Sequence, residues 1–172
     1  MKLRIFLSIV YCLSFFNSFS FSDSTITSKD FKNLTGCWQG SLTYLDYSTN
    51  KPFSMPANII VKDFKKNNII VCSFIYPNEP KANALDTIFI SKDGRLLNNE
   101  PIKTKRSFGN DSLEIVTEIN GMDGNDNKAA IIHHTYIIGS STYSIKKEVQ
   151  FIGQTKWILR NEYKFIRVKP CK

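Results

Sequence analysis

Two adjacent histidines, His133 and His134, are the only imidazole side chains in the 172-residue sequence, and they are the first candidates for chemistry. Histidine is the side chain that most often serves as an acid, a base or a metal ligand near neutral pH. Neighbours on a β-strand point to opposite faces, so this pair cannot hold one metal ion together. Alternation places His134 on the same face as Tyr136. We interpret His134 as a core or pocket histidine rather than a catalyst.

A single lysine lies on an otherwise apolar strand face. Lys147 shares that face with Tyr143 and Ile145, and Asn161 and Tyr163 face the same way on the following segment. A cation in an apolar cup with hydrogen-bonding neighbours suits an anionic amphiphile such as a fatty acid. The alternative is a lysine at the rim that reaches water. The predicted ligand-binding residues are Tyr44, His134, Tyr136, Lys147, Asn161 and Tyr163.

The other polar motifs do not support catalysis. The sequence contains no nucleophile elbow, no His-Glu-x-x-His segment and no phosphate-binding loop. Residues 123–128 alternate oxygen-bearing side chains as a calcium loop does, but Lys128 stands where the loop needs glycine and His134 where it needs glutamate. We interpret this segment as a polar hairpin loop. The sequence therefore predicts neither a metal nor a cofactor, and an enzyme is not favoured.

The elements that must position these residues are strands. From Gly36 onward, Trp38, Leu42 and Tyr44 fall on one face of an alternating segment and polar residues on the other. The last segment is expected at residues 156–168. Its odd-numbered residues from Trp157 to Phe165 are expected to face inward, and Arg160 outward. Similar segments, separated by short turns, are expected near residues 53–64, 69–76, 85–91, 95–97, 102–106, 113–120, 129–138 and 143–152.

Even spacing of short strands predicts an all-β, antiparallel up-and-down barrel of about 8–10 strands. A short helical turn precedes it at residues 28–34, with Ser28 as its cap and Phe31 and Leu34 facing inward. The nearly uniform hairpin-length connections favour a meander over crossing connections.

The first residues have the pattern of a secretory signal peptide. Lys2 and Arg4 precede an apolar run over residues 5–16, and small residues allow cleavage after Ser20 or Ser22. We predict a signal peptide at 1–22, one barrel domain at 23–172, and a secreted or periplasmic location without a membrane span after cleavage. The net charge is +8. The basic residues are scattered and no nucleic-acid motif is present, so no nucleic-acid partner is expected.

Gly36-Cys37-Trp38, at the start of the first strand, resembles the Gly-x-Trp signature of lipocalins and the wider calycin group. The resemblance implies that Trp38 plugs one end of a barrel and that an arginine near the last strand, Arg160 or Arg167, packs across it. We take Gly36, Trp38 and Arg160 as structural residues.

Two functions remain in competition. The first is a secreted or periplasmic barrel that binds a small apolar or anionic amphiphilic ligand. The rival is a barrel filled by its own aromatic side chains that acts as a protein-interaction module. A ligand carrier should contain an enclosed cavity of roughly 300 Å³ or more, whereas a filled barrel should not.

Three cysteines remain after the predicted cleavage: Cys37, Cys72 and Cys171. In a closed antiparallel barrel, the end of the last strand lies beside the start of the first. This adjacency predicts a Cys37–Cys171 disulfide and a buried, free Cys72. In lipocalins the C-terminal segment is often tied to a middle strand, which would imply Cys72–Cys171 instead. The absence of any disulfide is the third alternative.

Overall fold

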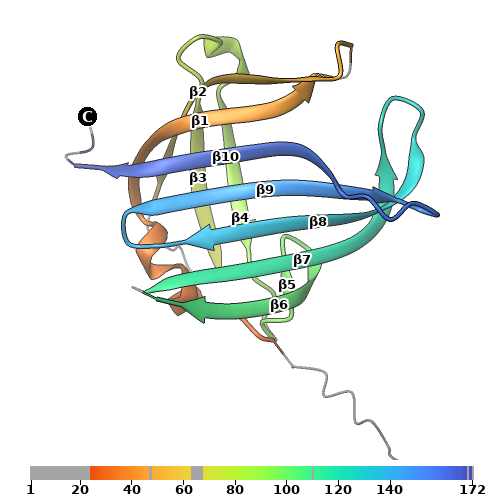
Figure 1. Ribbon diagram of the computed structural model, residues 1–172. Coiled ribbons are helices and arrows are strands. Elements are labelled where there is room, and N and C mark those ends of the chain that lie inside the picture. The colour runs from red at the N-terminus through yellow and green to blue at the C-terminus, as the bar shows by residue number, and fades with distance from the viewer. Residues whose placement is uncertain (1–23, 47, 63–67, 110, 170, 172) are drawn as a thin grey trace, which may run out of the picture.

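The computed structural model describes residues 24–46, 48–62, 68–109, 111–169 and 171 (Figure 1). The predicted signal peptide lies outside these residues. Two short 3-10 helices, η1 (Ser28–Leu34) and η2 (Pro80–Ala82), accompany ten strands. The strands are β1 (Gly36–Asp46), β2 (Lys51–Val61), β3 (Ile69–Ile75), β4 (Ala84–Phe89), β5 (Leu96–Leu97), β6 (Glu100–Phe108), β7 (Ser112–Asp123), β8 (Lys128–Ile138), β9 (Thr142–Phe151) and β10 (Ile158–Val168).

The strands form one antiparallel meander that curls into a nearly closed barrel. Their order in the sheet is β4-β3-β2-β1-β10-β9-β8-β7-β6-β5, and β10 pairs with β1. The two ends of this order meet where Ile90 bridges Leu97 and the amide of Asn98 donates to the carbonyl of Phe89 at 2.8 Å. The predicted fold class is confirmed.

One end of the barrel is closed by η1 (Figure 1). Phe31 and Leu34 are fully buried, as predicted. The expected cap Ser28 is wrong: the N-cap is Thr27, whose amide donates to the Asp30 carboxylate at 2.7 Å. Trp38 is 1% exposed, and its Nε1 donates to the carbonyl of Leu34 at 2.8 Å. The buried indole therefore joins η1 to β1.

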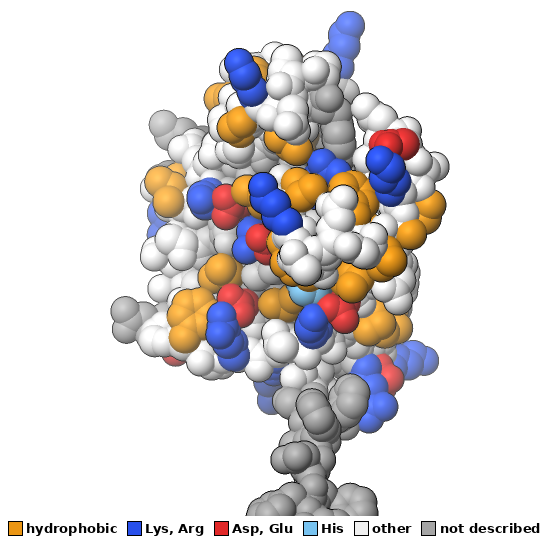
Figure 2. All heavy atoms as spheres, turned by 45° about the vertical axis from the view of Figure 1, so that its right-hand side comes forward, with side chains coloured by type: hydrophobic (Ala, Val, Ile, Leu, Met, Phe, Trp, Pro, Cys, Tyr) orange, Lys and Arg blue, Asp and Glu red, His pale blue; other side chains and the backbone are white. Residues whose placement is uncertain are grey.

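The opposite end, which we call the mouth, carries the β1–β2, β7–β8 and β9–β10 connections (Figure 1). Figure 2 shows this side with hydrophobic side chains interspersed among basic and acidic ones. Exposed large hydrophobic residues in the mouth-end segments are Phe53, Met122, Ile152 and Leu159. Within the described residues, no helix has the length and hydropathy needed to cross a bilayer.

The predicted alternation in the last strand holds only for its second half. The pairing of β10 with β9 shifts register between Leu159 and Asn161. A bulge inserts one extra residue and reverses the alternation beyond it. Arg160 is consequently buried instead of outward-facing, whereas Leu159 is 42% exposed. The ring of Trp157 lies against His133, with centroids 4.0 Å apart.

The Cys37–Cys171 disulfide is present, with the two Cα atoms 5.3 Å apart. Its position follows from the pairing of Cys37 with Val168 between β1 and β10. Cys72 is a buried free cysteine on β3, so the alternative Cys72–Cys171 pairing is wrong.

Candidate ligand-binding cavity

A cavity of about 310 Å³ lies inside the barrel, between β3–β4 on one side and β8–β10 on the other. Its lining is mostly aromatic and aliphatic, with a few polar groups. The residues that line it are Cys72, Phe74, Tyr76, Ala84, Leu85, Asp86, Ile88, Asn98, Tyr136, Tyr143, Ile145 and Tyr163.

The cavity reaches the surface beside β4. Asp86 pairs with the inward-facing Cys72, and Ala84 pairs with Phe74, so both β4 residues face the interior. Both are nevertheless exposed. The reason is that β4 approaches β5 only near its end, around Ile90, which leaves the flank of Ala84 and Asp86 uncovered. The cavity is therefore open to solvent beside these two residues.

Three tyrosine hydroxyls, those of Tyr76, Tyr136 and Tyr163, supply hydrogen-bonding groups at the cavity wall. The hydroxyls of Tyr76 and Tyr163 are 2.8 Å apart and share a hydrogen bond. The side-chain Nδ2 of Asn98 donates to the Tyr136 hydroxyl at 3.5 Å. The hydroxyl of Tyr143 is buried and has no hydrogen-bond partner among the described residues. Buried polar groups are almost always paired, so this hydroxyl is exceptional.

Tyr136, Tyr143 and Tyr163 are neutral at physiological pH. Burial is the main cause that raises the pKa of Tyr136, Tyr143 and Tyr163 well above the ordinary value for a phenol. Burial, followed by the charge of Asp86, raises the pKa of the Cys72 thiol to about 12. Asp86 also raises the pKa of each of these three tyrosines as a smaller cause. The cavity therefore offers uncharged donors in a region of negative potential.

A second set of interior polar residues lies in one row nearer the mouth. Cross-strand pairing runs from Tyr44 through Asn161, Lys147 and His134 to Thr117. This row spans β1, β10, β9, β8 and β7. Four of the six predicted ligand-binding residues belong to it, but none of the four lines the 310 Å³ cavity.

The charges of this row are paired within the barrel. Asp123, only 6% exposed, accepts from Lys147 Nζ at 2.9 Å and from Arg160 Nε at 2.6 Å. His134 Nδ1 lies 2.8 Å from a Glu100 carboxylate oxygen. Asp123 is the last residue of β7, whereas its position was predicted as part of a polar loop, so this pairing was not expected from the sequence. Lys147 points inward as expected, but its charge is neutralised by that carboxylate.

Of the six predicted residues, Tyr136 and Tyr163 line the cavity. Tyr143 was recognised as sharing the face of Lys147 but was not selected as a ligand residue. Tyr76 and Asp86 were missed, although both lie in predicted strand segments, 69–76 and 85–91. No local signal in the sequence shows that these segments face β8–β10.

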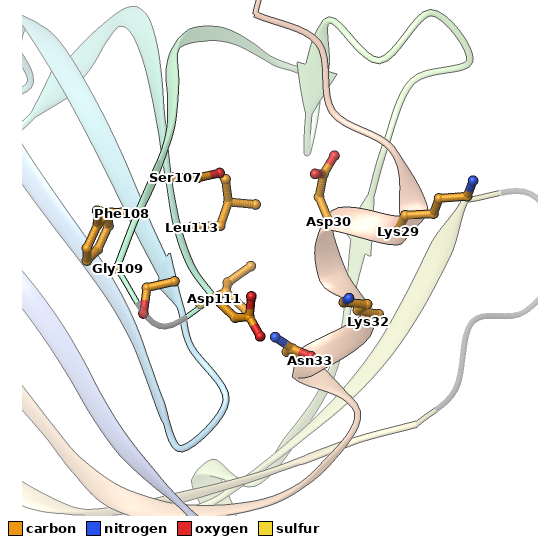
Figure 3. Close-up of a pocket in the computed structure, with 11 residues that line it drawn as sticks. Lys29, Asp30, Lys32, Asn33, Ser107, Phe108, Gly109, Asp111 and Leu113 are labelled. Carbon is orange, nitrogen blue, oxygen red and sulfur yellow. The ribbon is translucent and has the colours of Figure 1, made fainter.

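A separate hollow of about 470 Å³ lies between η1 and the β6–β7 turn (Figure 3). In Figure 3, Asp111 and Asn33 point toward one another across it, and Phe108 turns away. Lys29, Lys32 and Asp30 on η1 make its rim polar and of mixed charge. The interior cavity, with its aromatic walls, is the better candidate for a ligand with an apolar body.

The chain resembles a known protein in its fold only. No model of a protein family matches the chain, and no curated protein matches it. Among solved structures, the chain is similar to the crystal structure of Rv2717c from M. tuberculosis, with a TM-score of 0.54 and 11% sequence identity. The similarity covers 85% of this chain and 100% of that chain. At this identity the likeness concerns the barrel architecture, which the two proteins share.

Proposed function

We propose that this protein binds a small apolar or amphiphilic ligand inside its barrel. The observation that carries the proposal is the 310 Å³ cavity with aromatic walls. A dry cavity of about 150 Å³ accepts benzene, so this volume accommodates a ring with a side chain or a second ring. Binding sites for small molecules combine apolar walls with a few polar groups, as this cavity does.

In this proposal, the fit of the ligand's apolar part to the cavity accounts for most of the binding affinity. The ligand expected from the sequence carries an anionic head group that binds Lys147. Lys147 instead lies 2.9 Å from Asp123, and it does not line the cavity. An anionic amphiphile would have to displace this ion pair. Titration with decanoate tests whether an anionic head group binds Lys147. If it does, Lys147→Met should bind decanoate more weakly than the unmodified protein.

Fluorescence titration with the uncharged probe N-phenyl-1-naphthylamine tests cavity binding directly. We expect saturable binding by the purified protein. Ala84→Trp, which projects an indole into the cavity, should abolish it. Thr87→Trp is the matched control, because Thr87 lies on the same strand but pairs with Val71 on the outward face. Equal binding by both variants, or no binding by the unmodified protein, would contradict the proposal and favour the filled interaction module.

We also infer that the protein is exported and that its barrel is calycin-like. The Cys37–Cys171 disulfide supports export, because such bonds persist mainly in oxidising compartments. Trp38, packed under an arginine at the closed end, supports the calycin-like assignment. Expression of the full chain in a bacterium, followed by intact-mass measurement, tests export. A periplasmic product that lacks 20 or 22 residues is expected, and a full-length cytosolic product would overturn it.

A further inference from the structure

Exposed hydrophobic side chains are concentrated around the mouth of the barrel. The part of the chain that the structure describes has seven large hydrophobic side chains that are exposed. Four of them, Phe53, Met122, Ile152 and Leu159, flank the β1–β2, β7–β8 and β9–β10 connections, with exposed fractions between 42% and 62%. Single exposed hydrophobic residues are common on protein surfaces, but their concentration at one end marks an interaction surface.

Each of these three connections also carries an exposed lysine. We call residues 46–53, 122–128 and 151–160 the mouth rim. Its lysines, one in each connection, are Lys51, Lys128 and Lys156. Figure 2 shows basic and hydrophobic side chains interspersed on this side of the molecule. Exposed apolar side chains beside lysines are typical of protein segments that lie at a lipid interface.

The acidic residues of the mouth rim are mostly compensated. Asp123 is 6% exposed and lies between two basic side chains. Asp126 pairs with the lysine of its own hairpin, and the oxygens of Asp46 accept hydrogen bonds from the β1–β2 turn. Among the described residues, Lys51 and Lys156 have no ion pair. The rim contains four basic and three acidic residues in a chain of net charge +8, so its outward charge is positive.

A hollow of about 320 Å³ lies among the three connections. Its lining combines cations and amides with apolar side chains, namely Lys128, Arg160, Asn50, Asn125, Leu45, Phe151 and Ile158, together with Gly124 and Asp126. Asp126 pairs with Lys128 at 2.5 Å. A lipid head group needs this combination, because its phosphate requires a cation and its glycerol end requires apolar contacts.

A bilayer fits the mouth rim better than a protein partner does. A protein interface has a contiguous apolar core from which charged residues are depleted. The rim instead places its hydrophobic side chains on separate hairpins, with a lysine on each hairpin. The interface of a bilayer accepts such side chains one by one and supplies phosphates for the lysines.

We propose that the mouth rim docks on an anionic phospholipid bilayer. In this arrangement Met122, Ile152 and Leu159 enter the interface between head groups and acyl chains, and the three rim lysines contact phosphates. The end closed by η1 faces away from the membrane. This inference goes beyond the proposed function and does not depend on it, because no residue of the mouth rim lines the 310 Å³ cavity.

Cosedimentation with lipid vesicles tests the charge preference. We compare vesicles of phosphatidylcholine alone with vesicles that contain about one quarter phosphatidylglycerol, and we expect at least about tenfold tighter binding to the anionic ones. The Lys51→Gln, Lys156→Gln double variant should reduce this ratio to about threefold or less. The Lys29→Gln, Lys32→Gln double variant is the control, because these exposed lysines lie on η1 at the closed end. Equal binding to both vesicles, no binding to the anionic ones, or equal effects of the two double variants would overturn the inference.

A matched pair of isoleucines tests the apolar contact. Ile152→Gln should weaken binding to the anionic vesicles by about fivefold. Ile166→Gln is the control, because both isoleucines are 62% exposed but Ile166 pairs with Gln39 near the closed end. All variants carry the same N-terminal residues, so a difference between them reports the position of the substitution. Equal binding by Ile152→Gln and Ile166→Gln would contradict entry of the mouth rim into the interface.

The two tryptophans of the chain test the orientation of the docked barrel. Trp157 belongs to the mouth rim, whereas Trp38 is 1% exposed near the closed end. Brominated phosphatidylglycerol in the vesicles quenches indole fluorescence at the membrane. We expect this quenching for the unmodified protein and its loss in Trp157→Phe, which should still bind the vesicles. Quenching that persists in Trp157→Phe would place the closed end on the membrane and overturn the inference.

Vesicle binding and cavity binding fail separately. Ala84→Trp, which blocks the cavity, should bind the anionic vesicles as the unmodified protein does. Loss of vesicle binding in Ala84→Trp would contradict docking through the mouth rim alone. Vesicle binding without binding of N-phenyl-1-naphthylamine would contradict only the proposed function, and the reverse result would contradict only this inference.

Discussion

The guanidinium of Arg167 lies over the indole of Trp38, with its Cζ atom 4.1 Å from the ring centroid. It also donates to the carbonyls of Thr35 and Ser140, at 2.7 Å in each case, and to that of Asn33. One side chain from β10 therefore joins the end of η1, the start of β1 and the β8–β9 turn. Arg167, not Arg160, has the role that the lipocalin resemblance implies.

The same contact explains the glycine of the Gly-x-Trp segment. Gly36 has a φ of +127°, a conformation that other residues rarely adopt. A Cβ atom at this position would lie 2.7 Å from Arg167 Nη1. Glycine is needed here because it allows both the backbone conformation and the close approach of the guanidinium.

Replacing Arg167 should destabilise the barrel. We expect Arg167→Leu to lower the free energy of unfolding by about 2–4 kcal/mol, because three carbonyl contacts and the cation–π contact are lost together. Urea denaturation measures this. The control is Arg106→Leu, which removes a guanidinium whose side chain is 71% exposed beside Glu114 and should cost less than about 1 kcal/mol. Equal losses in the two variants would contradict the structural role of Arg167.

Asp123 should be more important for stability than other carboxylates near the mouth. Asp123→Asn leaves Arg160 and Lys147 without their common counter-charge in the barrel, and we expect a loss of about 3–5 kcal/mol. Asp126→Asn is the control, since Asp126 pairs with Lys128 in the same hairpin with both side chains 63% exposed. Thermal and urea unfolding would contradict the prediction if the two variants were indistinguishable.

Glu100 should contribute to acid sensitivity. Burial raises the pKa of Glu100, but hydrogen bonds from His134 and Thr117 outweigh it and hold the pKa below the ordinary value of 4.5. A carboxyl whose pKa is lower in the folded protein stabilises it above the ordinary pKa, and this stability is lost as the pH falls through the folded pKa. Glu100→Gln should therefore flatten the fall in unfolding free energy below about pH 4.5. Parallel curves for the two proteins would contradict this.

The Cys37–Cys171 disulfide should stabilise the barrel by restricting the unfolded chain. The two cysteines are 134 residues apart in the sequence. Chain entropy predicts that the Cys37→Ser, Cys171→Ser double variant loses up to about 4–5 kcal/mol. Denaturation with and without a reductant measures the difference: the reductant should lower the stability of the unmodified protein and leave the double variant unchanged.

Cys72 should be chemically inert in the folded protein. Its thiol is buried, and burial raises its pKa to about 12, so little reactive thiolate is present at pH 8. Iodoacetamide should modify Cys72 only after the protein is unfolded. Mass spectrometry of the native protein after treatment would contradict this if it showed rapid alkylation at Cys72.

The barrel could be predicted because alternation and turn residues are local properties of the sequence. Each strand needs one apolar face, and that requirement is visible in segments such as 113–120 without knowledge of the partner strand. Closure of the meander then follows, and the Cys37–Cys171 pairing follows from closure. The row through Tyr44, Asn161, Lys147 and His134 was likewise within reach, because its members share inward faces.

The cavity was decided by tertiary structure. Asp86 and Tyr143 are far apart in the sequence, and they line one cavity only because β3–β4 curl to face β8–β10 across the barrel. The incomplete pairing of β4 leaves this cavity open to solvent. The bulge beside Arg160 also depends on context, since the pairing of β10 with β9 must absorb an extra residue. Sequence alternation reveals which faces are apolar, whereas the packing of non-adjacent strands determines where the apolar interior remains unfilled.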